Sequence, residues 1–247
     1  FQSFVNQVKD TVVICGDDRL ASQLKHSTAK VVTYGFNEGN DYQIKNVKTT
    51  SENSEFDVYK NSELLGTFTM AVFGLHDISN ATSAIALADI CGLSTDEIQQ
   101  SLGSYHHAER RFTEHKVGTN VVVDDYAHHP SEIKATIDSA RRKYSDKQII
   151  AIFQPHTYTR TAKFLNEFAE SLLTADKVFL CTIFASVRAK VKIVGIEDLK
   201  KVTPGSEIIS GEEHFDKLNF DNSVILFMGA GTINQLCNKF VEHTSNK

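Results

Sequence analysis

The sequence contains no tryptophan, three prolines, two methionines and only four cysteines. Those cysteines lie far apart and form no C-x-x-C pair: Cys15, Cys91, Cys181 and Cys237. This spacing argues against a disulfide framework and favours reduced thiols. We therefore expect a cytoplasmic protein in which three of these thiols lie in apolar surroundings.

Long apolar runs and blocks of like charge are also missing. We find no stretch long and apolar enough to cross a bilayer, and no secretory signal, so the sequence predicts no membrane insertion. The net charge of −5 and the lack of a basic arm argue against nucleic acid as a partner. The basic residues 141–143 come at the end of a predicted helix, where cations stabilise the helix macrodipole.

The remaining composition is typical of a soluble globular protein. Of the 247 residues, 41% are apolar and 23% are charged. This length suffices for one large domain or two ordinary ones. The chain opens on the amphipathic stretch 1–5 with no methionine before it. We therefore expect a fragment whose amino-terminal part has been removed.

Residues 1–104 are expected to form one unit. Two short apolar strands at 11–15 and 31–34 flank a short helix at 20–24, which is the rhythm of a parallel sheet. Three strands in a meander follow, and then two helices. Their expected ranges are 42–48, 56–60 and 64–72 for the strands, and 77–91 and 95–102 for the helices.

In residues 105–247, strands and helices alternate. This pattern predicts an α/β fold with a Rossmann-like, mostly parallel sheet and helices on both faces. The expected strands are 111–116, 120–125, 148–153, 177–181, 207–210 and 223–228. The expected helices are 130–144, 162–174, 196–202, 212–218 and 232–242.

Unusual polar residues follow four of the strands predicted for this second unit. In an open parallel sheet, ligands bind outside the carboxyl ends of the strands. We therefore expect these segments to converge on one edge and to form a ligand site. The segments are 124–130, 154–160, 182–188 and 229–231.

The first of these segments has both functional and structural explanations. Asp124 and Asp125 provide more acids than one helix cap requires, so a functional role is favoured. We expect Asp125, at a strand end, to lie outside the core. His129 directly precedes Pro130 and suits an N-cap, whereas His128 has no such structural role.

The other polar residues leave alternatives open. A lone histidine is usually structural, but His156 and Arg160 together on this edge suit an anionic ligand. Arg111 precedes a strand at the domain junction, where an arginine can hold a phosphate; solvated charge is the alternative. The turn 229–231 is either a tight strand-to-helix connection or a direct backbone contact with ligand.

These motifs resemble the muramyl ligase family, in particular its alanine-adding members. The segments that carry the resemblance are DDYAHHP at 124–130, FQPHTYTRT at 153–161, RRF at 110–112, NEFA at 166–169 and MGAG at 228–231. GLHDISNA at 74–81 is similar to the Gly-x-His-Asn-x-x-Asn-Ala segment of the family's central ATPase domain. The resemblance covers nearly the whole chain and is most specific between residues 105 and 165.

The resemblance implies three domains in the family, the first of which binds UDP. Here residues 1–104 would be the carboxy-terminal part of the central ATPase domain, and 105–247 the amino-acid-binding domain. No G-x-x-x-x-G-K-[ST] phosphate loop occurs in the sequence, and the family's main magnesium ligands would lie before Phe1. Asp77 replaces a usual asparagine near the adenine, and Thr232 stands where an acid or amide is more usual.

The resemblance also implies a reaction. It is the ATP-dependent ligation of L-alanine to UDP-N-acetylmuramate through an acyl phosphate, with Mg²⁺ as cofactor. Because water destroys an acyl phosphate, the site must close around it. The reaction belongs to cytoplasmic peptidoglycan synthesis, and thus to cell-wall formation, cell shape and cell division. The fragment alone is expected to be inactive.

Site residues follow from the same resemblance. The nucleotide site would comprise His76, Asn80, Arg111 and Asp125, and the alanine site Tyr126, His128, His156 and Arg160. Asp125 and His128 would be the catalytic residues, and Arg160 would bind the alanine carboxylate. No metal ligand is assigned within the chain.

Two other functional classes remain open. The alternating sheet and the closing Gly-x-Gly suit a nucleotide- or dinucleotide-binding redox protein, although no G-x-G-x-x-G follows the first strand of either unit. A non-catalytic binding module is the second class, because the phosphate loop is missing. Nicotinamide fluorescence tests the first class, and activity assays on the chain and on the intact protein test the second.

Overall fold

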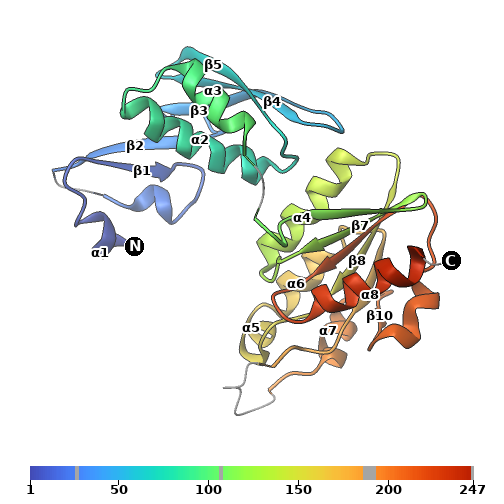
Figure 1. The fold of residues 1–247 in the computed structure, drawn as a ribbon. Coiled ribbons are helices and arrows are strands. Elements are labelled where there is room, and N and C mark those ends of the chain that lie inside the picture. Colours follow the sequence, from blue (N-terminus) through green and yellow to red (C-terminus); the bar gives the residue numbers. More distant parts are fainter. Residues whose placement is uncertain (26–27, 106–107, 186–192, 246–247) are drawn as a thin grey trace. The chain divides into compact units, whose positions relative to one another are not determined.

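A computed structural model describes residues 1–25, 28–105, 108–185 and 193–245 of the chain. The chain divides into two compact units, Phe1–His106 and His107–Lys247 (Figure 1). Each unit has its own sheet and its own hydrophobic core.

Unit 1 is built on a mixed sheet in the strand order β1-β2-β3-β4-β5. The first three strands are parallel neighbours, whereas β3, β4 and β5 form an antiparallel meander. The strands are β1 Thr11–Cys15, β2 Lys30–Gly35, β3 Tyr42–Thr49, β4 Ser54–Lys60 and β5 Glu63–Met70. Asn61 and Ser62 both have positive φ, at 48° and 73°, which is the geometry of a tight two-residue hairpin turn. The expected meander is confirmed.

Two long helices cover this sheet. They are α2 Leu75–Ile90 and α3 Thr95–Gly103, and α1 Gln2–Val5 is a single turn at the start of the chain. Helix α2 buries Ile78 and Ile85 in a core that also contains Phe56 and Phe68. Burial of such side chains contributes about 1.5–3 kcal/mol each, so this face holds the helix on the sheet.

The helix expected at 20–24 is only the 3₁₀ turn η1 Ala21–Gln23. The Asp18 carboxylate accepts hydrogen bonds from the backbone N–H groups of Leu20 and Ala21. Leu20 is exposed, so no apolar stripe binds a longer helix to the sheet. A local carboxylate turn therefore replaces the amphipathic helix that the leucine spacing suggested.

Unit 2 contains a six-stranded sheet in the order β10-β9-β8-β11-β7-β6. Every neighbouring pair is parallel except β6 and β7. The strands are β6 Thr113–Val117, β7 Asn120–Asp125, β8 Gln148–Phe153, β9 Lys177–Leu180, β10 Glu207–Ile208 and β11 Ser223–Met228. The predicted α/β class with a mostly parallel sheet is confirmed.

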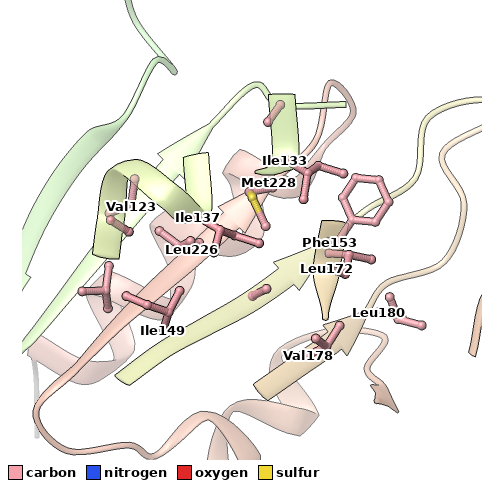
Figure 2. Close-up of a cluster of buried hydrophobic side chains, with 14 of the residues drawn as sticks. Val123, Ile133, Ile137, Ile149, Phe153, Leu172, Val178, Leu180, Leu226 and Met228 are labelled. Carbon is pink, nitrogen blue, oxygen red and sulfur yellow. The ribbon is translucent and has the colours of Figure 1, made fainter. Parts of the chain in front are cut away.

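Helical segments cover both faces of this sheet. They are α4 Pro130–Lys143, α5 Tyr158–Lys163, α6 Leu165–Leu172, α7 Ile196–Val202, η2 Glu212–Leu218 and α8 Ile233–Ser245. On one face, Ile133 and Ile137 of α4 pack with Leu226 and Met228 of β11 (Figure 2). On the other face, residues of η2 and α8 pack with the alternate residues of β11, including Phe227. Because both faces are buried, the central strands are continuously apolar.

The helix expected at 162–174 is two helices, α5 and α6. Phe164 separates them, with φ −117° and ψ 30°, and its ring lies edge-on to His129 with centroids 4.8 Å apart. Apolar residues continue in register through the break, so periodicity alone did not reveal it. The segment expected as a helix at 212–218 is also different, because η2 is a 3₁₀ helix.

The cysteines are free thiols. Cys181 and Cys237 are buried, and burial raises the pKa of each thiol to about 12. Cys15 is partly buried, whereas Cys91 is exposed. Within the described part of the chain, none of the helices combines the length and the hydropathy that crossing a bilayer requires.

Candidate functional site at the carboxyl edge of the unit 2 sheet

The strand register of unit 2 brings four loop segments to one edge. Met228 pairs with both Asp125 and Phe153, and Phe153 pairs with Leu180. Strands β7, β11, β8 and β9 therefore end at the same level, and the residues after them begin there. The predicted convergence is confirmed for the described residues. Positions 186–188 of the third segment, including Arg188, lie outside the described residues.

Asp125 is the last residue of β7, and only 6% of it is exposed. Its two carboxylate oxygens accept hydrogen bonds from the backbone N–H groups of Phe112 (2.9 Å) and Ala127 (2.8 Å). Burial raises the pKa of this carboxyl, and the two backbone donors oppose that rise. The expectation that Asp125 lies outside the core is therefore wrong. The carboxylate is engaged in fixing the surrounding loops.

Asp124 is also buried and is paired with Arg110. Arg110 Nε lies 3.2 Å from Asp124 Oδ2, and Arg110 Nη2 donates to the Gly229 carbonyl oxygen at 2.7 Å. Burial raises the pKa of Asp124, while the neighbouring guanidinium lowers it. Arg110 had no role assigned from the sequence, where it appears only as part of the RRF segment at 110–112.

Arg111, the second arginine of the doublet, is exposed. It makes no salt bridge with any residue in the described ranges, and its guanidinium lies 5.8 Å from the centroid of the Tyr126 ring. Arg111 can thus bind an anion, whereas the Arg110 guanidinium is already bound to Asp124 and to the Gly229 carbonyl oxygen.

The loop after β7 is organised by Glu132. Its carboxylate accepts the backbone N–H groups of His128 (2.9 Å) and His129 (3.0 Å), and His129 is the N-cap of α4 as predicted. His128 Nδ1 lies 2.9 Å from the Tyr126 carbonyl oxygen, which can only accept. In the neutral ring the proton is therefore on Nδ1, and Nε2 carries the lone pair. His128 Nε2 is thus suited to accept a proton or a hydrogen bond.

His156 and Arg160 follow β8. The His156 ring stacks on Phe184, with centroids 5.6 Å apart and an interplanar angle of 15°, and lies 6.3 Å from the His128 ring. Burial lowers the pKa of His156, and the positive charge of Arg160 lowers it further. Arg160 lies within α5, whereas the sequence placed it in a loop before a helix that starts at 162.

This cluster contains buried polar atoms without partners. Among the described residues, nothing hydrogen-bonds to His156 Nδ1 or Arg160 Nη1. An unpaired buried donor costs about 1–3 kcal/mol, more when it is charged. Tyr126 (36% exposed), His128, His156 and Arg160 are therefore brought together around groups that a polar ligand would satisfy.

Thr157, between these two residues, has an unfavourable backbone conformation with φ 67° and ψ 137°. A β-branched residue is strained there, whereas glycine adopts positive φ freely. We expect Thr157→Gly to raise the free energy of unfolding by about 1 kcal/mol, measured by urea denaturation. In the matched variant Thr159→Gly, in the regular part of α5, it should fall by a few tenths of a kcal/mol. A loss at Thr157 as large as at Thr159 would contradict the strain.

The glycines of the turn 229–231 are explained by close packing. A Cβ atom on Gly229 would lie 2.7 Å from the Gln154 carbonyl oxygen, and one on Gly231 would lie 2.6 Å from Phe184 Cγ. Side chains at these positions would displace their neighbours. The structural explanation of this turn is thus favoured over a backbone contact with ligand.

A cavity of about 330 Å³ opens on the α8 side of the same edge. Gln154 and Thr232 line it, together with Glu212 and Lys239, which form an ion pair at 2.6 Å. Thr232, which departs from the family pattern, thus borders this cavity.

His76 and Asn80 belong to unit 1. They are four residues apart near the start of α2, so both lie on one exposed face of that helix. His76 Nε2 lies 3.4 Å from Asp77 Oδ1, so the carboxylate that replaces the family's asparagine engages its own neighbour.

No group of three or more His, Cys, Asp or Glu side chains suited to a metal ion occurs in the described ranges.

Comparisons with known proteins agree with this architecture. The model of the Mur ligase middle domain matches residues 1–88, and that of the Mur ligase, glutamate ligase domain matches residues 110–231. A curated UDP-N-acetylmuramate–L-alanine ligase from Levilactobacillus brevis is 43% identical over 234 residues, covering 94% of this chain and 53% of the relative.

Solved structures extend the similarity to the fold. The UDP-N-acetylmuramate–alanine ligase of Thermotoga maritima aligns with a TM-score of 0.76 and 28% identity, over 96% of this chain and 52% of that one. A MurF ligase of Thermotoga maritima in complex with ADP aligns with a TM-score of 0.70, over 96% of this chain and 54% of that one; at 17% identity it shows the fold alone. The chain spans about half the length of the relatives it matches. Because two Mur ligase domain models match its two units in succession, the chain belongs to the Mur ligase family.

Proposed function

We propose that the chain is part of an ATP-dependent ligase that joins L-alanine to UDP-N-acetylmuramate through an acyl phosphate. The observation that carries the proposal is the cluster of Tyr126, His128, His156 and Arg160. Two of its members carry a buried nitrogen atom to which none of the described residues hydrogen-bonds. The 43% identity to a curated alanine ligase supports the choice of amino acid.

Within this proposal, unit 2 is the amino-acid-binding domain, with bounds near 105–247. The Arg160 guanidinium binds the alanine carboxylate, because a planar fork matches the two carboxylate oxygens. His156 is kept neutral by burial and by the adjacent guanidinium, so it hydrogen-bonds without adding charge. His128 Nε2 accepts a proton from the alanine ammonium group, and the free amine that results attacks the acyl phosphate. Tyr126 borders the same space.

Unit 1, with bounds near 1–104, is the carboxy-terminal part of the central ATPase domain. Its contribution to the nucleotide site is the exposed face of α2 that carries His76 and Asn80. In unit 2, Arg111 is the group for the ATP phosphates, because it is exposed and not committed to an acid. Asp125 is buried and acts by holding the backbone of Phe112, the residue after Arg111.

Magnesium has no assigned step in this chain. The described residues contain no group of three or more His, Cys, Asp or Glu side chains suited to a metal ion. The family resemblance implies that the main protein ligands of an ATP-bound Mg²⁺ lie outside this chain. We place the reaction in the cytoplasm and in peptidoglycan precursor synthesis, on which cell shape and division depend. The support is the similarity to the curated alanine ligase.

The test is an assay of ADP release with each substrate omitted in turn. The full-length gene product should release ADP only when ATP, UDP-N-acetylmuramate and L-alanine are all present. Release that is as fast with a different amino acid, or without the muramate, would overturn the proposal.

We expect the 247-residue chain alone to show no turnover in the same assay. It contains no G-x-x-x-x-G-K-[ST] segment, and hence lacks the backbone amides and lysine that cradle ATP phosphates. Product formation by the purified chain, checked by mass spectrometry, would refute this expectation. Weak ADP binding by the chain would be compatible with it.

A further inference from the structure

Arg110 connects three segments of unit 2 through its side chain. It forms an ion pair with Asp124 in β7, donates to the carbonyl oxygen of Gly229 after β11, and lies 5.0 Å over the centroid of the Tyr126 ring. A guanidinium can make all three contacts because its donors spread in a plane while its face stacks on an aromatic ring. An ammonium group, as a point charge, cannot make them together.

The backbone around Arg110 is strained. Arg110 and Phe112 have φ values of 60° and 53°, so two left-handed residues flank Arg111. Positive φ is uncommon outside glycine and persists only where the surroundings hold it. Here the Arg110 carbonyl oxygen accepts the Tyr126 N–H at 2.8 Å, and the Arg110 N–H donates to Thr113 Oγ1 at 3.2 Å.

The result is a clasp, formed by residues 110–112 and by Asp124 to Tyr126. Asp124 is only 7% exposed, so removal of the guanidinium would leave a buried carboxylate without its ion-pair partner. The same guanidinium, together with that of Arg111 at 5.8 Å, lies against the Tyr126 ring, which in turn meets the edge of His128 at 5.3 Å.

We infer that Arg110 is a positioning residue: the clasp holds the Tyr126 ring and the Arg111 backbone in the geometry that the ligase reaction uses. This inference rests on the proposed function of the site. Arg110 itself is occupied by protein groups and does not touch substrate. The two adjacent arginines thus have different roles. Arg110 orients the clasp, whereas the exposed Arg111 is placed to bind a phosphate.

The test uses Arg110→Gly and Arg110→Lys, with Arg142→Ala as control, since Arg142 is exposed at the end of α4. Glycine suits the positive φ, so it removes the side chain without adding backbone strain. Hydrogen–deuterium exchange of the peptides that cover 110–113 and 126–129 is measured first, because it does not depend on activity. We expect at least tenfold faster exchange in Arg110→Gly, a smaller effect in Arg110→Lys, and no change in Arg142→Ala.

Steady-state kinetics of the full-length gene product follow. We expect Arg110→Gly to lower kcat about tenfold to a hundredfold while the Michaelis constant for UDP-N-acetylmuramate stays unchanged, because a misplaced group costs rate more than remote binding. Arg110→Lys should recover part of the loss. Unchanged exchange in Arg110→Gly overturns the inference whatever the enzyme catalyses, and so does faster exchange with a wild-type kcat. Should the enzyme use another amino acid, the proposed function fails, and the same comparison with that amino acid still decides the role of Arg110.

Discussion

Replacing Arg160 with alanine should raise the Michaelis constant for L-alanine about tenfold to a hundredfold and leave that for ATP unchanged. Arg160 Nη1 is buried, and nothing among the described residues hydrogen-bonds to it. A carboxylate placed there would gain charge-assisted hydrogen bonds of about 1.5–3 kcal/mol, and about 1.4 kcal/mol corresponds to a factor of ten. The measurement is steady-state kinetics of the full-length gene product with L-alanine and ATP varied separately.

Two further variants sharpen this test. Arg160→Lys should recover only part of the loss, because an ammonium group does not match both carboxylate oxygens. Arg142→Ala, which removes an exposed arginine of the same unit, should behave like the wild type. If Arg160→Ala instead raised the Michaelis constant for ATP alone, Arg160 would belong to the nucleotide site. Its assignment to the alanine site would then be wrong.

Replacing Asp125 with alanine should lower the free energy of unfolding by about 2–4 kcal/mol, because it strands two buried N–H groups at about 1–3 kcal/mol each. These are the backbone donors of Phe112 and Ala127. Relief of the buried charge offsets part of this loss, since burial raises the pKa of the carboxyl. The sequence had instead placed Asp125 outside the core, and the family resemblance had implied a catalytic role for it.

Urea unfolding of the chain, followed by circular dichroism, measures this effect. Asp125→Asn should lie between the wild type and Asp125→Ala, because an amide can accept one of the two N–H groups but not both. Asp146→Ala removes an exposed carboxylate and is the control. An unchanged midpoint for Asp125→Ala, together with lost turnover in the full-length gene product, would restore the catalytic role that the sequence suggested.

Local sequence signals predicted most of the elements. Alternating and continuous apolar runs located the strands of both sheets, and His129 before Pro130 predicted the N-cap of α4 correctly. These signals depend on interactions within a few residues, such as burial of one face or capping of one end. They failed at η1 Ala21–Gln23, where the Asp18 carboxylate forms a local turn, and at Phe164, whose ring contacts a residue distant in sequence. Phe164 interrupts the helix expected at 162–174 because its backbone leaves the helical region where its ring meets His129.

The candidate site likewise has features that the sequence determined and features that only the tertiary structure decided. The sequence by itself determined the residue types at the carboxyl edge, because parallel strands with polar residues after them converge there. Tertiary structure alone decided which of these groups are committed to protein partners. Asp125 accepts two backbone N–H groups, and Arg110 is held by Asp124 and the Gly229 carbonyl oxygen. Arg111 forms no salt bridge with any of the described residues.

The physical reason is the length of chain between partners. Arg110 and Gly229 are 119 residues apart, so no local pattern reports that the first donates to the second. Periodicity and motif spacing describe which side chains a segment carries on each face. In this chain they predicted the carboxyl edge of the unit 2 sheet and the polar residue types that gather there. Burial and hydrogen bonding between distant segments decide which polar groups remain unpaired. Only the folded chain shows that His156 Nδ1 and Arg160 Nη1 are buried without a hydrogen-bond partner among the described residues.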